Sequence, residues 1–197
     1  MTENTGGQQS RDDAQALLPA RSAAEMHLFL DLHPCDCGAA RQRGVQELRE
    51  GGNGGLMSVY AGTCTGCGRQ WSVAFSLPES PPPADRIGGS EPSAIIDPGE
   101  WLWLSDQDAS IPAGGPARPG DRARLGRAAA ELDEAAKFIP PGLDAVPSSA
   151  FTTSLGRAML DAFPHRFLRA DLEGRAAGRD AGVLVAEPEP LTGVDDR

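Results

Sequence analysis

The chain has 197 residues, and its 24 glycines, 17 prolines and 5% aromatic residues predict a folded core smaller than the length implies. The formal net charge is −10, and no segment has the dense basic surface that phosphate backbones require, so nucleic acid is a disfavoured partner. The longest apolar run, around Leu28–Leu32, is too short to cross a bilayer. Residues 1–16 lack the apolar core of a secretory signal. These features predict a cytoplasmic protein with no membrane partner, whose thiols stay reduced.

The first structured segment is predicted to be a helix within residues 17–34. Ser22 can cap its N-terminus, and Glu25, three residues later, can reach back to the cap. Pro34 is expected to end it, because the residue before a proline avoids the helical conformation. Alternating leucines between residues 28 and 32 would also fit a short strand.

Residues 35–77 have the pattern of a small sheet. The segments around 45–48 and 56–61 flank a Gly-Gly-Asn-Gly-Gly turn, as the two strands of a hairpin do. Farther along, large apolar residues at every second position predict a strand with one buried face. These residues are Trp71, Val73, Phe75 and Leu77.

The four cysteines occur in two pairs, one before and one after the predicted hairpin. Cys64 and Cys67 have the spacing of a zinc knuckle, in which Gly66 and Gly68 permit a tight turn and a close approach of the backbone. The other pair, Cys35-Asp-Cys37, is one residue shorter than the usual knuckle, which leaves either of its thiols open to replacement as a ligand. His33 is the candidate substitute.

On these cysteines, residues 35–77 resemble the zinc-ribbon family, over about a fifth of the chain. The resemblance implies a fold and a structural Zn²⁺ held by Cys35, Cys37, Cys64 and Cys67, and it implies no activity. A site closed by four thiolates has no open position for a substrate, which argues against metal catalysis. Two alternatives remain open: a redox dithiol, which normally lies where a strand enters a helix, and a disulfide, which would be strained within Cys-x-Cys.

Residues 78–96 are rich in proline and glycine and predict a linker or a long ordered loop. A helix should then begin with Asp97 as its N-cap, Pro98 in the first turn and Glu100 completing the cap. Trp101 and Trp103 would point about 200° apart on that helix. Either the helix is packed between the ribbon and the C-terminal helices, or Trp103 is exposed as an interaction residue.

The last third of the chain is predicted to be helical, within a segment spanning 97–183. An apolar stripe with helical spacing runs from Leu125 to Ile139 and is ended by two prolines. Further helices are expected near residues 155–160 and up to about residue 179. The polar N-terminus, 1–16, is expected to be disordered, and the acidic tail, 184–197, to be mobile.

Together these elements predict an α+β fold: a zinc-ribbon sheet with an N-terminal helix and a C-terminal helical segment. The function predicted first is that of a non-catalytic, zinc-binding accessory or protein–protein interaction protein. The alternative is a zinc-ribbon nucleic-acid-binding regulator, whose support is a set of arginines in the ribbon: Arg41, Arg43, Arg49 and Arg69. An enzyme with a site assembled from dispersed residues is the third hypothesis, since the chain has neither a His-Glu-x-x-His nor a Gly-x-Ser-x-Gly motif.

Overall fold

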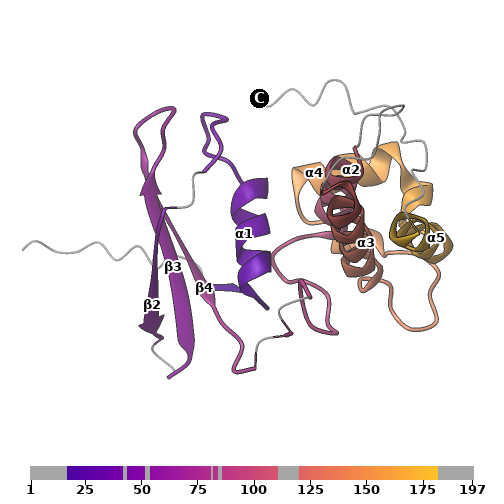
Figure 1. Cartoon of the computed structure of the whole chain (residues 1–197), viewed down its shortest axis with the longest axis horizontal. Helices are drawn as coiled ribbons and strands as arrows, with labels where there is room; N and C mark the ends of the chain where they lie inside the picture. Colours follow the sequence, from indigo (N-terminus) through magenta and orange to yellow (C-terminus); the bar gives the residue numbers. More distant parts are fainter. Residues whose placement is uncertain are drawn as a thin grey trace, which may run out of the picture.

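The structure of the protein is a computed structural model that describes residues 17–41, 44–51, 54–80, 82–83, 86–110 and 120–181. The segments predicted to be disordered or mobile, 1–16 and 184–197, lie outside the described residues. The described chain is α+β, with one four-stranded mixed sheet and five α-helices. Figure 1 shows the sheet on one side, helix α1 beside it, and the remaining helices grouped on the far side of α1.

The sheet has the strand order β1-β4-β3-β2. Its main part is an antiparallel meander of β2 (Val45–Glu50), β3 (Leu56–Thr63) and β4 (Gln70–Ser76), so the predicted hairpin and the predicted third strand are confirmed. β1 (Leu18–Pro19) pairs with β4 in parallel and was not predicted. A two-residue strand is too short to show any periodicity, and its pairing depends entirely on β4.

Helix α1 (Ala23–Leu32) covers one face of the sheet. Ser22 caps it as predicted, because its side chain accepts a hydrogen bond from the backbone N–H of Glu25. The Glu25 carboxylate reaches one residue farther back than predicted and accepts from the backbone N–H of Arg21 at 2.6 Å. The alternative of a strand at the leucines is therefore wrong. The core shared by α1 and the sheet consists of Ala20, Met26, Leu30, Tyr60, Val73 and Phe75.

Helix α2 (Pro98–Ala109) begins with the predicted capping box at Asp97 and Glu100. The helical layer is completed by α3 (Asp121–Ala136), α4 (Ser154–Ala162) and α5 (Arg169–Asp180). The predicted stripe packs in its core from Ala129 onward, whereas Leu125 belongs to a separate small cluster with Ala109 and Ala128, and α3 ends three residues before Ile139. The fully buried apolar residues of this core include Trp101, Leu102, Leu132, Ala135 and Leu172.

The two tryptophans of α2 both pack in the helical core, Trp101 at 0% exposure and Trp103 half-buried. The neighbour on the side of α2 toward the sheet is α1, because Phe29 of α1 packs against both the helical core and the core of the sheet. Figure 1 shows α1 between the sheet and the helical layer. The sequence predicted that α2 packs between the ribbon and the C-terminal helices. In the structure α1, and not the sheet, lies on that side of α2.

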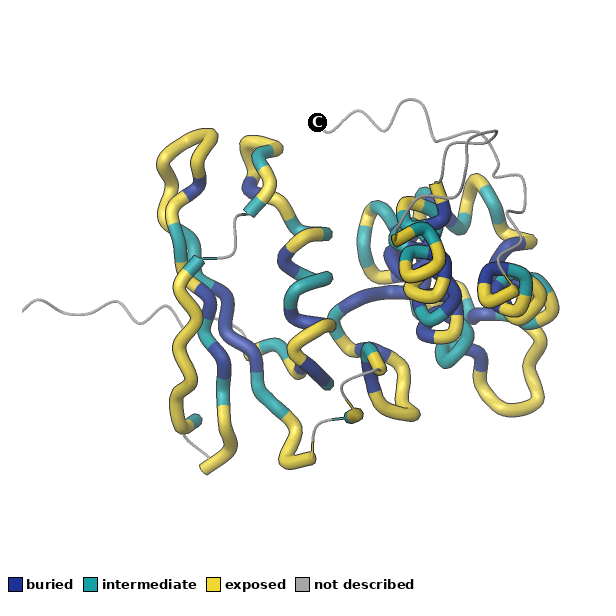
Figure 2. Tube along the Cα trace, viewed as in Figure 1, coloured by how far each residue is buried: buried dark blue, intermediate teal, exposed yellow. Residues whose placement is uncertain are grey.

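Residues 86–96 form a loop that ties the sheet side of the molecule to the helical layer. The backbone oxygen of Ile87 accepts a hydrogen bond from the Ser22 hydroxyl, and that of Gly89 accepts one from Lys137 Nζ at 2.7 Å. Arg21 adds a direct ion pair with Glu134 of α3, at 2.8 Å. In Figure 2 the buried positions lie on the facing sides of the sheet, α1 and the helical layer, which is consistent with one continuous packing arrangement.

Candidate metal centre

The four cysteine sulfurs lie together at one end of the sheet. Their Sγ atoms are all within 4.8 Å of one another, with Cys35 3.6 Å from Cys67 and Cys37 3.5 Å from Cys64. A tetrahedral metal with four metal–sulfur bonds of about 2.3 Å separates its sulfurs by about 3.8 Å. The cluster therefore has the size of a four-thiolate metal site, and the residues fit such an ion.

The first turn brings Cys35 and Cys37 to the same point although only one residue separates them. The N–H of Cys35 donates to the backbone oxygen of Ala39 at 3.0 Å, and the N–H of Gly38 donates to that of Cys35 at 2.7 Å. Gly38 has φ 79°, a left-handed conformation that side chains disfavour. The chain reverses immediately after Cys37, so the shortened spacing still places both thiols in the cluster.

The second turn follows the predicted knuckle. Cys64 exchanges backbone hydrogen bonds across it, donating to Arg69 at 2.8 Å and accepting from Gly68 at 2.9 Å. Gly68 has φ 72°. A Cβ on Gly66 would lie 2.8 Å from the Cβ of Ala39 and 3.2 Å from Cys37 Sγ. The two glycines therefore have separate roles, since Gly68 forms the turn and Gly66 lets the two turns meet.

Backbone N–H groups make the cluster suitable for thiolates. Those of Cys67 and Gly66 lower the pKa of Cys64 to about 6. For Cys37, the N–H of Ala39 lowers the pKa, but the neighbouring sulfurs of Cys64 and Cys67 outweigh it and raise the pKa to about 11. The neighbouring sulfurs therefore hold the Cys37 thiol in its protonated form by hydrogen bonding, while the Cys64 thiol is favoured as the thiolate. A metal ion at their centre would replace these shared protons, because a metal binds thiols in their deprotonated form.

His33 is directed away from the cluster, so it is not the substitute ligand considered from the sequence. Its Nδ1 lies 2.8 Å from the backbone oxygen of Phe29, and its ring stacks on the Phe29 ring with centroids 4.0 Å apart. Its Nε2 lies 3.4 Å from a carboxylate oxygen of Glu100. His33 therefore joins the end of α1 to the start of α2. The four candidate metal ligands are all cysteines.

The redox and disulfide alternatives find no support in this geometry. All four cysteines are free. Strand β3 ends at Thr63 and β4 begins at Gln70, so the turn containing Cys64 and Cys67 connects two strands. A redox dithiol normally lies at the start of a helix, whose dipole favours the thiolate.

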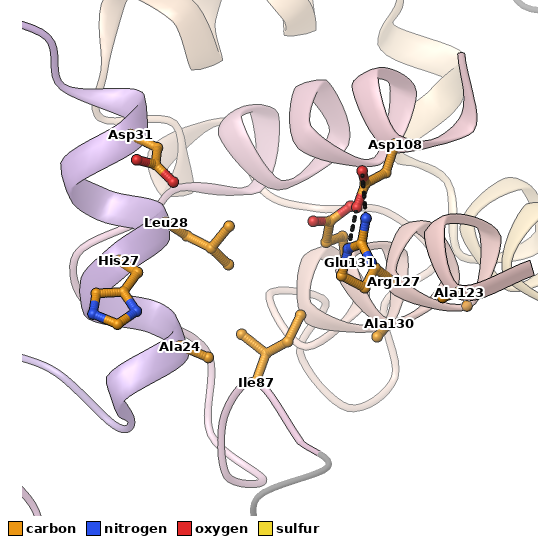
Figure 3. Close-up of a pocket in the computed structure, with 11 residues that line it drawn as sticks. Ala24, His27, Leu28, Asp31, Ile87, Asp108, Ala123, Arg127, Ala130 and Glu131 are labelled. Carbon is orange, nitrogen blue, oxygen red and sulfur yellow. Dashed lines mark hydrogen bonds and ion pairs between the residues drawn. The ribbon is translucent and has the colours of Figure 1, made fainter. Parts of the chain in front are cut away.

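A second concave feature, which no sequence motif indicated, is a groove of about 550 Å³ between α1 and the helical layer. Figure 3 shows Leu28 of α1 extending into this space, toward Asp108, Arg127 and Glu131 on its other side. Arg127 donates to the Asp108 carboxylate at 2.8 Å, whereas Glu131 is only 3% exposed. Burial raises the pKa of Glu131 to about 8. These residues come from three helices, which is why spacing along the sequence did not reveal the groove.

No family model, no curated relative and no solved structure matches the chain, so comparison with known proteins assigns it no family. Among the described helices, none combines the length and the apolar composition that crossing a bilayer requires.

Proposed function

We propose that this chain is a non-catalytic accessory or protein–protein interaction protein of the cytoplasm, stabilised by one structural Zn²⁺ on Cys35, Cys37, Cys64 and Cys67. The observation that carries the proposal is the four-sulfur cluster, whose sulfur separations match a tetrahedral ion. The zinc-ribbon architecture is part of the proposal and rests on this cluster at the junction of two turns with a β-hairpin between them.

The small size of the sheet core supports a structural role for the metal. Among the described residues, six buried apolar side chains form the core between the sheet and α1, and all six residues of β2 are exposed. A sheet with so little buried apolar surface is marginally stable without a further constraint. Metal binding to thiolates supplies free energy of folding, because the unfolded chain has no preformed site.

Zinc is the ion that the ligand set favours. Four thiolates in a tetrahedron select Zn²⁺ or iron over hard cations such as Mg²⁺ and Ca²⁺. All four coordination positions would be filled by sulfur, so substrate could reach the ion only by displacing a ligand. The proposed role of the ion is therefore to hold the two turns together.

Ion pairing within the sheet favours a protein partner over nucleic acid. Arg49 pairs with Glu47 at 2.6 Å, Arg69 pairs with Asp36, and the Arg41 guanidinium lies over the Trp71 ring, 5.7 Å from its centroid. Arg43 lies outside the described residues. Phosphate binding depends on cations that can replace condensed counterions, and two of these arginines already have carboxylate partners. Absence of retardation of DNA and RNA in a low-salt gel shift would support the protein partner.

Metal analysis of the freshly reduced protein tests the proposal. We expect about one zinc per chain, no visible absorption from iron, and joint loss of metal and solubility in Cys64→Ser, because folding and binding are coupled. Asp36→Asn is the matched control, since Asp36 lies between two of the cysteines but pairs with Arg69 at the surface. Well under half an equivalent of zinc would contradict the metal site, and turnover dependent on the bound metal would contradict the non-catalytic role.

A further inference from the structure

Strand β2 forms one outer edge of the sheet, and its backbone has hydrogen-bonding groups available on one side. The N–H of Gly51 donates to the oxygen of Gly55 at 2.7 Å, in register with the pairing of Glu50 and Leu56. In antiparallel strands, bonded and non-bonded pairs alternate. Odd-numbered residues of β2 therefore point their backbone groups toward β3, and Gln46, Leu48 and Glu50 point theirs outward.

The side chains of this edge are also uncovered. All six residues of β2 are exposed, with Val45 at 70% and Leu48 at 61%, the two highest values among the exposed large apolar residues. Figure 2 shows β2 exposed along its length, with no described segment over its outer side. An open edge with exposed apolar side chains is a template for another strand.

We propose that β2 is a dimerisation edge, at which β2 of a second copy of this chain pairs in antiparallel orientation to form one continuous sheet. This inference goes beyond the zinc-stabilised role, because it names the partner as a second copy and places it on the outer edge of the sheet. The charges and symmetry of β2 itself favour a second copy as the partner.

Symmetry leaves few registers for such a pair. The two-fold axis must stand perpendicular to the sheet, because each face of one copy then continues into the same face of the other. As a result, odd-numbered residues lie opposite odd-numbered ones. The axis then passes through position 47, 48 or 49 at the centre of the strand. An axis at Glu47 places two glutamates opposite each other, and one at Arg49 places two arginines opposite each other, both of which are repulsive.

With the axis at Leu48, no like charges lie opposite each other. This axis places Leu48 against its own copy. The Glu47–Arg49 pair of one strand, 2.6 Å apart, then lies opposite the Arg49–Glu47 pair of the second copy, so each of these side chains keeps its intrachain partner and also faces an opposite charge across the interface. Gln46 lies opposite Glu50 of the second copy. The three residue pairs that use the outward-pointing backbone groups can exchange two N–H···O bonds each. Charged residues normally protect an edge strand from association, but the order Glu-Leu-Arg makes these charges attractive toward their own copy.

Sedimentation of the zinc-loaded full chain at increasing concentration tests the proposal. We expect a monomer–dimer equilibrium that weakens with added salt, because the paired charges are at the surface. Leu48→Lys places two like charges on the axis and should raise the dissociation constant about tenfold or more. Leu143→Lys is the matched control, because Leu143 is similarly exposed, at 50%, in the loop after α3.

A charge-reversal pair identifies the register. Glu47→Arg and Arg49→Glu should each weaken self-association, since each variant opposes like charges. A mixture of the two single variants should form a heterodimer, because every opposed pair is then of opposite sign. A wild-type monomer at all concentrations, or a dimer unaffected by Leu48→Lys, would overturn the proposal. A monomer with full zinc content would contradict only the dimer, and a dimer without zinc would contradict only the metal site.

Discussion

The carboxylate of Asp97 accepts a hydrogen bond from the Thr153 hydroxyl at 2.8 Å, joining the N-termini of α2 and α4. The same oxygen, Oδ2, also accepts from the backbone N–H groups of Thr152 and Thr153. The other oxygen, Oδ1, accepts from Gly99 and Glu100 in the capping box of α2. Thr153 in turn caps α4 by accepting from Gly156. A single buried side chain therefore caps its own helix and fixes the start of a second one.

We expect Asp97→Asn to lower the free energy of unfolding by about 2 kcal/mol, because an amide presents a donor where five donors converge. Asp161→Asn is the control, since Asp161 is exposed near the end of α4 and its replacement should change stability by less than about 0.5 kcal/mol. Urea denaturation of the zinc-loaded variants measures both values. Equal stability of the two variants would show that the Asp97 network contributes little.

Two helical glycines should respond to alanine in opposite directions. A Cβ on Gly156 of α4 would overlap the Asp97 carboxylate, whereas a Cβ on Gly174 of α5 meets nothing within 4 Å. We expect Gly156→Ala to destabilise the protein by about 2 kcal/mol or more through overpacking. Gly174→Ala should stabilise it by about 0.5–1 kcal/mol, because alanine is the better helix former. A gain in thermal melting temperature for Gly156→Ala would contradict the close contact of these helices.

Glu131 should make the protein less stable as the pH rises. Burial is the largest cause that raises its pKa from 4.5 to about 8; Asp108 and Asp106 act in the same direction, and Arg127 and Arg179 oppose them. Between pH 4.5 and 8 the folded state holds a proton that the unfolded state releases, so stability falls by up to about 1.4 kcal/mol per pH unit. As the pH rises from 6.5 to 8, the free energy of unfolding of Glu131→Gln should therefore increase by about 1–2 kcal/mol relative to that of wild type.

The measurement is denaturant unfolding at both pH values, a range in which other groups titrate equally in the two proteins. Glu173→Gln serves as the control, because Glu173 lies exposed on α5. The same difference between variant and wild type at pH 6.5 and at pH 8 would show that Glu131 is ionised in the folded protein.

Gly66→Ala should weaken metal binding while leaving the knuckle able to form. The added methyl would lie 2.8 Å from Ala39 Cβ and 3.2 Å from Cys37 Sγ, so the two turns must separate. We expect zinc affinity to fall about 10- to 100-fold, as it does when the surroundings of metal ligands are disturbed. Competition with a chromophoric chelator measures it, with Thr65→Ala, an exposed neighbour in the same turn, expected to bind like wild type.

Trp103→Ala separates a packing role from an interaction role. Trp103 packs against the helical core and is half-buried, so its truncation should lower the melting temperature by several degrees. A melting temperature equal to that of wild type would instead favour Trp103 as a contact residue for a partner.

The sequence by itself determined the features that depend on neighbouring residues. Ser22 and Asp97 cap helices within three residues of themselves, and the glycine-rich turn connects adjacent strands. The knuckle at Cys64 and Cys67 is likewise closed by hydrogen bonds inside one turn. Such interactions are local, so composition and spacing predict them.

Only the tertiary structure decided which distant groups meet. It brought Cys35 and Cys37 to the second knuckle, turned His33 toward Glu100, and aligned Asp97 with Thr153. It also paired Asp106 with Arg166, which is buried. Each of these contacts joins residues that local backbone preferences leave independent. Their positions follow from how sheet, α1 and helical layer bury apolar surface together, and that packing has no signature in the spacing of residues along the chain.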